Sequence, residues 1–299
     1  MLSVSVCICA YNEGKNIERA IRSVYSQKID GFEISEVIVV SSGSTDDTDA
    51  TVEGSMKDFP SLRLIRQEKR AGKNSAVNEF LDNKKEGSIA VLLNGDNILG
   101  NELSLHHLIS PFNDAKVGMT GGHPVPTNDK KSTMGFASHM IWTMHHHVAL
   151  IVPKIGELVA FRDPGIRLST SMQSDEDLIK MELEKNGYVS VYVPDAIVLN
   201  RGPETKEDFM KQRTRVNIGE EHMRKKFGYS VSTWNKKLLF RALMGSVRDL
   251  GFHPVKMFIA VRMEMGARKA AKAHVSSDKE DMNVWSRVDS TKDVKKEPK

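Results

Sequence analysis

The sequence predicts an α/β protein with a mostly parallel central sheet flanked by helices, followed by a helical C-terminal extension. Two patterns predict the sheet: short apolar, β-branched runs recur between segments with helical periodicity, and each run ends in a polar loop. A chain of 299 residues, 39% of them hydrophobic, is long enough to bury a substantial core. The composition excludes a collagen, a disulfide scaffold and a wholly disordered chain.

The first half alternates strands and helices in chain order. The predicted strands are the apolar runs 4–10, 36–40, 62–66 and 89–93. The predicted helices are 15–27, a helix opened by the polar turn 41–48, and 75–81. Thr45 and Asp46 are both plausible N-caps for the second helix. Strands separated by helices imply right-handed crossovers and a parallel sheet.

The second half is less regular. The predicted helices are 101–112, 133–150, 175–185 and 204–227. The predicted strands are 116–121, 158–162 and 188–193. Two amphipathic helices follow Lys236, separated near 251–254, and the polar end of the chain is expected to be disordered. We therefore expect a main domain over 1–230, a basic helical extension over 231–273 and a disordered tail over 274–299.

The formal net charge of +4 is unevenly distributed. Residues 236–272 carry nine basic and two acidic side chains, a charge of +7, while 273–299 sum to zero and 1–235 carry −3. A mildly acidic body argues against a nucleic-acid groove on the main domain, so we expect no nucleic-acid partner.

Two cysteines point to a reducing compartment. Cys7 and Cys9 lie two apart in one predicted strand, so they face the same way and pair only with strain. The sequence shows no signal-like segment before Ser3 and no apolar run long enough to span a membrane. We therefore expect a cytoplasmic protein with both thiols reduced.

Polar residues follow four of the predicted strands, over 10–13, 41–46, 67–73 and 94–97. In parallel sheets ligands bind beyond the carboxyl ends of the strands. Any single strand-to-helix loop is polar for trivial reasons, but four in succession favour a nucleotide site. The chain lacks both the glycine-rich dinucleotide motif and the P-loop motif, which disfavours those two classes.

Six spaced motifs carry a resemblance to a known family. They are Tyr11-Asn12-Glu13, Ser41-Ser42-Gly43-Ser44-Thr45-Asp46, Gly72-Lys73-Asn74-Ser75-Ala76-Val77-Asn78, Asn94-Gly95-Asp96, Ser174-Asp175-Glu176-Asp177-Leu178, and Gln212-Arg213-Thr214-Arg215-Val216 followed by Gly219. In this order, over about residues 1–230, the chain resembles the family 2 glycosyltransferases of the GT-A fold. The resemblance implies an inverting transferase that uses a nucleotide-sugar donor.

The resemblance also implies where the donor binds. Its implied donor residues are Ala10, Tyr11, Asn12, Glu13, Ser41, Ser42, Asp46, Lys73, Asn94, Gly95 and Asp96. A UDP-sugar is favoured and a GDP-sugar is the alternative. The implied cofactor is a divalent cation, Mg²⁺ or Mn²⁺, with Asp96 as its ligand, because such a cation neutralises charge that develops on the leaving diphosphate.

Two further motifs are implied to carry the chemistry. A carboxylate must accept the proton of the acceptor hydroxyl, and the resemblance assigns this to Asp177, with Glu176 and Asp175 as rivals. The structural alternative is an acidic helix N-terminus favoured by the helix dipole. Gln212, Arg213 and Arg215 are implied to lie near the diphosphate and acceptor. An exposed, charged helix face is the alternative for them.

The chain departs from the family pattern at four places. Serines 41 and 42 stand where acids are usual, which leaves uridine specificity open. Asn94 replaces the first acid of the Asp-x-Asp motif, and Asn200 stands where a His is frequent; both lower the expected cation affinity, although amide oxygens can still bind hard cations. Val216 replaces a Trp. With no spanning helix expected, single-sugar transfer is favoured over polymer synthesis.

The extension leaves two alternatives open. Leu239, Leu243 and Val247 form one apolar stripe and Phe258 and Ile259 belong to a second, both among basic residues. Such helices lie in an anionic membrane interface or pack on protein. The first alternative suits a polyprenyl-linked acceptor and a peripheral position on the cytoplasmic membrane face. Two rival functions are a catalytically impaired relative that only binds nucleotide-sugar or a partner, and a sugar nucleotidyltransferase.

Overall fold

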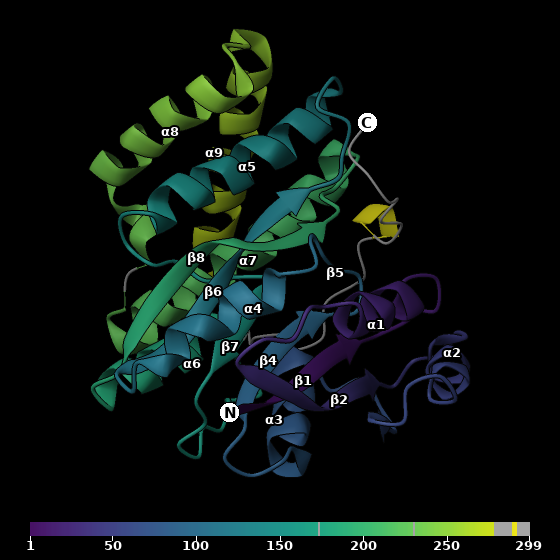
Figure 1. Cartoon of the computed structure of the whole chain (residues 1–299). Helices are drawn as coiled ribbons and strands as arrows, with labels where there is room; N and C mark the ends of the chain where they lie inside the picture. Colours follow the sequence, from purple (N-terminus) through teal and green to yellow (C-terminus); the bar gives the residue numbers. More distant parts are fainter. Residues whose placement is uncertain (173, 230, 278–288, 292–299) are drawn as a thin grey trace.

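A computed structural model describes residues 1–172, 174–229, 231–277 and 289–291 (Figure 1). Over these residues one eight-stranded sheet forms, in the order β3-β2-β1-β4-β7-β6-β8-β5. The strands are β1 (Leu2–Ala10), β2 (Phe32–Ser42), β3 (Leu62–Gln67), β4 (Ile89–Asn94), β5 (Ile98–Leu99), β6 (Val117–Pro126), β7 (Leu158–Phe161) and β8 (Val189–Asn200). The predicted α/β class with a mostly parallel sheet is confirmed.

The two halves of the sheet meet at β4 and β7. Strand β1 pairs in parallel with both β2 and β4, and β2 pairs in parallel with β3. Strand β7 is antiparallel to β4 and to β6, with Leu93 opposite Leu158, whereas β6 and β8 are parallel. The carboxyl ends of β1, β2 and β4 therefore share one edge, as the sequence predicted, and the start of β7 arrives at that edge from the second half.

Helices cover both faces of the sheet. They are α1 (Ile17–Tyr25), α2 (Thr48–Ser55), α3 (Lys73–Asn83), α4 (Ser104–Ile109), α5 (Thr133–Ala149), α6 (Asp175–Lys185), α7 (Lys206–Phe227), α8 (Lys236–Leu250) and α9 (Pro254–Ser276), with short 3₁₀ segments at Ser110–Asn113, Ser232–Trp234 and Asp289–Thr291. The predicted helix 101–112 becomes α4 plus the first 3₁₀ segment, because Pro111 cannot donate the next α-helical hydrogen bond. Most of the predicted tail 274–299 lies outside the described residues.

Two local expectations come out differently. The N-cap of α2 is Asp47 rather than Thr45 or Asp46, although the Asp46 carboxylate accepts from the N–H of Thr48 at 3.0 Å. The last predicted strand, 188–193, continues to Asn200 as β8, because its second part pairs with β6 beyond a register shift. The second difference arises from a pairing partner distant in sequence.

Alternating side chains of the strands belong to two apolar cores, one on each face of the sheet. Val6 and Ile8 of β1 belong to one core and Cys7 to the other, and all three are fully buried. The Cys7 and Cys9 sulfur atoms lie 3.6 Å apart and are free thiols, as the sequence predicted. Burial raises the pKa of the Cys7 thiol well above its usual value, so this group is an inert part of the core.

The C-terminal extension has one packed face and one exposed face. Ala242 of α8 and Ala260, Met263 and Ala267 of α9 are buried where these helices meet α5 and α7. In Figure 1, α8 lies beside α5 at the end of the molecule farthest from α2. Among the described residues no helix has both the length and the apolarity to cross a bilayer.

A buried ionic network fastens α9 to α7. Arg213 makes two bonds to the Glu264 carboxylate, at 2.7 and 3.1 Å, and Arg268 makes a third at 2.9 Å. Asn217 donates to the same carboxylate at 3.3 Å. Burial works against ionisation of Glu264, but Arg213 and Arg268 outweigh it and lower its pKa to about 2. The carboxylate therefore stays ionised wherever the fold is intact.

We predict that Glu264→Ala destabilises the fold by about 2–3 kcal/mol, because it leaves the guanidinium of Arg213 buried without its partner. A carboxylate with a lowered pKa contributes stability above its unfolded pKa of about 4.5 and loses it as the pH falls towards 2. The difference in the free energy of unfolding between wild type and variant, measured by denaturant unfolding, should therefore shrink as the pH is lowered. Glu102→Ala, which breaks the exposed pair with Lys28, is the control and should cost under about 0.5 kcal/mol. A neutral-pH loss no larger than the control's would contradict the network's role.

Candidate functional site

A cavity of about 740 Å³ opens at the carboxyl ends of β1, β2 and β4. Its walls come from these strand ends, the loop before α3, the start of α6, and the facing sides of α5, α7 and α9. Most of the residues predicted for the donor and the chemistry line it: Ala10, Tyr11, Glu13, Ser42, Lys73, Asn94, Asp96, Asp175, Glu176, Asp177, Gln212, Arg213 and Arg215. The fold thus gathers four predicted loops into one place.

The other predicted donor residues, Asn12, Ser41, Asp46 and Gly95, are not part of the lining. Asn12 has a left-handed backbone (φ 54°), and its side-chain oxygen accepts from the N–H of Thr45 at 2.7 Å. Asp46 accepts from the N–H of Gly14 at 3.1 Å. The Ser41 hydroxyl donates to that of Ser44 at 2.9 Å. Asn12, Ser41 and Asp46 therefore shape the loops that carry the lining residues.

An arginine stacked on a tyrosine forms one wall. The Arg70 guanidinium lies 3.9 Å from the centre of the Tyr11 ring, a cation–π contact. The Ser42 hydroxyl accepts from the N–H of Ala71 at 3.1 Å, which holds the loop in place. Gly43 has a φ of +65°, and a Cβ there would lie 2.5 Å from the Arg70 nitrogen. Only glycine lets the second-strand turn approach this loop so closely.

Lys73 holds two carboxylates at the start of α6. Its Nζ lies 2.7 Å from Asp175 and 3.2 Å from Glu176. Burial alone would lower the pKa of Lys73, but these acids raise it well above its usual value. Burial and the nearby Glu176 raise the pKa of Asp175 to about 8. Lys73 and Asp175 lower the pKa of Glu176 to about 2 against the effect of burial. Glu176 therefore carries the negative charge that balances Lys73, and Asp175 keeps its proton to higher pH while lying against the same Nζ.

Asp177 differs from these two neighbours. Burial raises its pKa to about 6, only partly opposed by the positive charge of Lys154. Lys154 itself pairs with Glu220 at 2.8 Å. Within the described residues, Asp177 has no hydrogen bond or ion pair. It is a carboxylate whose pKa lies close to neutrality and whose oxygens remain available, which is what a general base requires.

Sequence reasoning missed Glu157, a buried carboxylate beside the Asn94-Gly95-Asp96 motif. One of its oxygens accepts from the side-chain amide of Asn94 at 2.8 Å and from that of Asn97 at 2.7 Å. Its backbone is left-handed, with a φ of 64°. Burial, together with the charge of Asp96, raises its pKa despite the amide donors. No spacing in the sequence links Glu157 to Asn94, because the contact joins residues 63 apart.

The two arginines of the predicted diphosphate motif have different environments. Arg213 is bound by Glu264, whereas Arg215 makes no hydrogen bond or ion pair with any residue that the structure describes. Burial lowers the pKa of Arg215, although Glu157, Asp96 and Asp175 counteract this. Arg215 therefore presents a desolvated cation to the cavity, and Gln212 lines the cavity beside it.

Two further polar side chains line the cavity. The side-chain oxygen of Asn200 and both ring nitrogens of His145 are buried without a hydrogen-bond partner. Burial lowers the pKa of His145 to about 3, so its ring is neutral. No group of three or more His, Cys, Asp or Glu side chains able to hold a metal occurs among the described residues. A cation here would need oxygen ligands beyond protein carboxylates.

Residues 5–169 match the family described as Glycosyl transferase family 2, which is more than half of the chain. The chain therefore belongs to glycosyl transferase family 2.

Two curated relatives illustrate the spread of the family. The uncharacterized protein MT1568 of Mycobacterium tuberculosis is 37% identical over 116 residues, which is 39% of this chain and 34% of that protein. The poly-beta-1,6-N-acetyl-D-glucosamine synthase of Staphylococcus aureus is 23% identical over 224 residues, 71% of this chain and 53% of that protein. The chain thus spans about a third and about half of these two relatives.

Solved structures share the fold. The mannosyltransferase PcManGT from Pyrobaculum calidifontis, in complex with GDP-Man and Mn²⁺, has a TM-score of 0.65 at 21% identity and covers 93% of this chain and 88% of its own. The glucosyl-3-phosphoglycerate synthase of Mycobacterium tuberculosis, in complex with Mn²⁺ and UDP, has a TM-score of 0.51 at 20% identity over 77% of this chain and 82% of its own.

We predict that Lys73→Met lowers stability by about 2 kcal/mol and more strongly at alkaline pH. Without Lys73, the folded pKa of Asp175, which already lies above its unfolded value, rises further, and Glu176 loses the positive charge that lowers its pKa. Both changes remove stability as the pH rises past about 4–5. The drop in melting temperature relative to wild type should therefore be larger at about pH 8 than at about pH 5. Lys69→Met, at an exposed position of the same loop, should leave the melting temperature unchanged at both pH values. A pH-independent drop would contradict this reading of the ion pair.

Proposed function

We propose that this chain moves one sugar, with inversion, from a nucleoside-diphosphate sugar to an acceptor hydroxyl or phosphate. The observation that carries the proposal is the juxtaposition, in one cavity, of a desolvated Arg215 and of Asp177, a carboxylate with a raised pKa and available oxygens. Arg215 suits a leaving diphosphate, and Asp177 suits a base.

The donor occupies the end of the cavity formed by β1, β2 and β4. The Arg70–Tyr11 stack and Ser42 lie there, and a planar base matches such a wall. The fold neighbours bind GDP-Man in one case and UDP in the other, which supports a nucleoside diphosphate as the shared element. A UDP-sugar stays favoured. A GDP-sugar is the alternative, because Ser41 and Ser42 supply hydroxyls where the family usually has acids.

A divalent cation, Mn²⁺ or Mg²⁺, fits beside Asp96. Such cations prefer oxygen ligands, and they are commonly held by one or two carboxylates together with substrate phosphates. The absence of a three-ligand cluster from the described residues agrees with that arrangement. When bound, the cation offsets negative charge on the leaving diphosphate.

The transfer step is a direct displacement. The acceptor oxygen attacks the anomeric carbon, and the bond from that carbon to the diphosphate oxygen breaks. The bonding electron pair leaves with the nucleoside diphosphate, whose charge Arg215 stabilises. When the acceptor is a hydroxyl, its proton passes to Asp177; an ionised phosphate acceptor attacks without losing a proton. Each turnover releases one nucleoside diphosphate. Attack from the face opposite the leaving group inverts the anomeric configuration.

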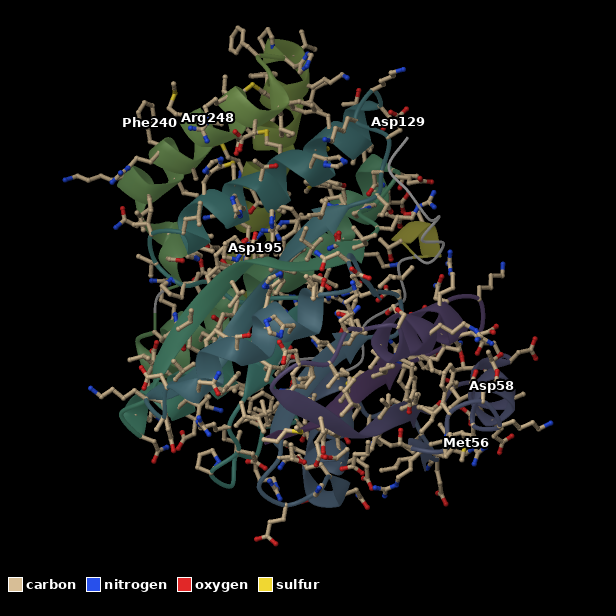
Figure 2. The ribbon with its side chains drawn as sticks, viewed as in Figure 1. Met56, Asp58, Asp129, Asp195, Phe240 and Arg248 are labelled. Atoms are coloured by element: carbon tan, nitrogen blue, oxygen red, sulfur yellow. The ribbon has the colours of Figure 1, made fainter. Side chains whose placement is uncertain are left out.

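The acceptor is lipid-linked in this proposal, and α8 and α9 hold the enzyme at a membrane on its cytoplasmic face. Their outer face exposes large apolar side chains: Phe240, Met244, Phe252, Val255, Phe258, Val261 and Met265. Basic residues Lys236, Lys237, Arg241, Arg248 and Arg262 are exposed on the same two helices. Figure 2 shows Phe240 and Arg248 on α8, far from Met56 and Asp58. Charge complementarity selects an anionic lipid surface.

The cavity continues towards this face. Leu239, Val261 and Met265 line it together with Trp142 and Met144 of α5. An acceptor whose lipid lies in the interface would reach Asp177 along this apolar wall. We therefore propose that residues 1–230 carry the donor site and the base, and that residues 231–273 hold the acceptor end at a membrane.

Nucleotide release from a panel of UDP- and GDP-sugars with polyprenyl-phosphate lipids and Mn²⁺ or Mg²⁺ tests the activity. We predict that, with a hydroxyl acceptor such as a lipid-linked saccharide, Asp177→Asn lowers turnover by about 10²–10⁴-fold while the affinity for UDP or GDP stays within about twofold. The base must be ionised to act, so the wild-type rate should fall as the pH drops below the pKa of about 6. Saturable nucleotide binding without turnover on any donor would show the impaired relative instead. An active Asp177→Asn would move the base to another carboxylate.

Co-sedimentation with liposomes tests the membrane surface. We predict that the chain pellets with phosphatidylglycerol vesicles, more weakly at high salt, and that Phe240→Ser/Phe258→Ser reduces the bound fraction at least about fivefold. Phe227→Ser, an exposed phenylalanine on α7, is the matched control and should bind like wild type. Equal binding by all three proteins, or equal binding to neutral vesicles, would overturn the proposed surface.

A further inference from the structure

Glu157 lies where the family motif at the end of β4 has lost an acid. The antiparallel register of β4 and β7 sets Leu93 opposite Leu158. Asn94 is the last residue of β4 and Glu157 is the residue that precedes β7, and the Asn94 amide donates to Glu157 at 2.8 Å. A carboxylate from the loop before β7 therefore lies against the position that holds an amide in this chain.

The carboxylate of Glu157 is held by one oxygen only. Both amide donors, from Asn94 and Asn97, bind Oε2, at 2.8 and 2.7 Å. Oε1 receives no hydrogen bond from any residue in the described part of the chain, and the side chain lines the cavity. This arrangement fixes the orientation of the group while leaving an oxygen to bind a ligand.

The surroundings of Glu157 favour a cation as that ligand. Its carboxylate and that of Asp96 are close enough to repel each other, and Glu176 adds to this repulsion, with Lys73 opposing it. Two carboxyl groups that line one cavity, with a diphosphate supplying more oxygens, match the oxygen-rich coordination of Mn²⁺ or Mg²⁺. The cation would relieve the repulsion that the fold imposes.

We propose that Glu157 is a second carboxylate ligand of the divalent cation, and that Asn94 acts as the residue that positions it. The residue that precedes β7 thereby supplies the charge that the Asn94-Gly95-Asp96 motif lacks. This inference rests on the proposed function, since the donor diphosphate completes the coordination.

A purely structural Glu157 would serve only as an acceptor for two amides. Glutamine performs that role equally well, because its side-chain oxygen can accept from Asn94 and Asn97. Glu157→Gln therefore keeps the hydrogen bonds and removes the charge, which separates the two roles.

The test measures Mn²⁺ affinity by electron paramagnetic resonance of free Mn²⁺, in the presence of saturating UDP or GDP and without acceptor. Wild type should bind Mn²⁺ with either nucleotide or both, and Glu157→Gln should bind at least about tenfold more weakly with an unchanged melting temperature. The double variant Asn94→Asp/Glu157→Gln returns a carboxylate to the motif and should recover most of the affinity. Glu102→Gln, an exposed acid on the loop before α4, is the control and should match wild type.

Wild-type Mn²⁺ affinity in Glu157→Gln would overturn the assignment, as would equal weakening in both Glu157 variants together with a lowered melting temperature. Failure of the proposed function has a different signature. If the affinities follow the expected pattern but no donor is turned over, the transferase proposal fails and the assignment of Glu157 stands. If wild type transfers sugar yet binds no Mn²⁺ with either nucleotide, the assignment fails alone.

Discussion

The ion pair of Lys73 with Asp175 and Glu176 joins two parts of the chain about a hundred residues apart, and the cavity depends on it. Lys73 is the first residue of α3, in the parallel half of the sheet, and the two acids begin α6. Hydrogen bonds extend the junction: Asn74 donates to the carbonyls of Ser169 and Met172, at 2.8 and 2.9 Å. The N-terminus of α3 therefore positions the segment that leads to Asp177.

This junction explains why the motif over residues 72–78, at the start of α3, contains asparagine side chains. The Asn78 side chain donates to the carbonyl of Leu168 and accepts from its N–H, both at 2.8 Å. Such a pairing acts like one rung of a sheet ladder and fixes the loop before α6 against α3. Lys73 and Asn78, five apart in the motif, thus act at the two ends of one contact. The motif orients α6, the helix whose first residues are the three acids. It can therefore shape the site without contacting the donor.

Much of this architecture could be predicted from local sequence. β-Branched runs located the strands of the parallel half, and the carboxyl ends of parallel strands necessarily share an edge. Loops containing Tyr11, Ser42, Lys73 and Asp96 therefore meet in one cavity. Glu157 could not be found in this way, because its contact with Asn94 depends on the register of an antiparallel strand far along the chain. No local period encodes that register.

The roles of Arg213 and Arg215 show a second limit of prediction from the sequence. Both arginines line the cavity, but only Arg213 has a carboxylate partner among the described residues. The sequence does not show which arginine is paired. That depends on α9, whose Glu264 binds Arg213 and leaves Arg215 without an ion pair in the described part of the chain. The basic extension thus contributes to the proposed chemistry as well as to anchoring.

Helix α9 belongs to the C-terminal extension and also forms part of the cavity wall. The proposed position at a membrane therefore has a consequence for catalysis. Glu264 and Arg268 of α9 line the cavity, while Val255 and Phe258 of the same helix are exposed and do not line it. A rigid helix transmits displacement along its length, so whatever seats the outer face also sets where the inner side chains lie. In an enzyme with a lipid-linked acceptor, docking on the membrane would then align the acceptor and tighten α9 against α7 in a single event. Anchoring and substrate positioning would be one structural function of the extension.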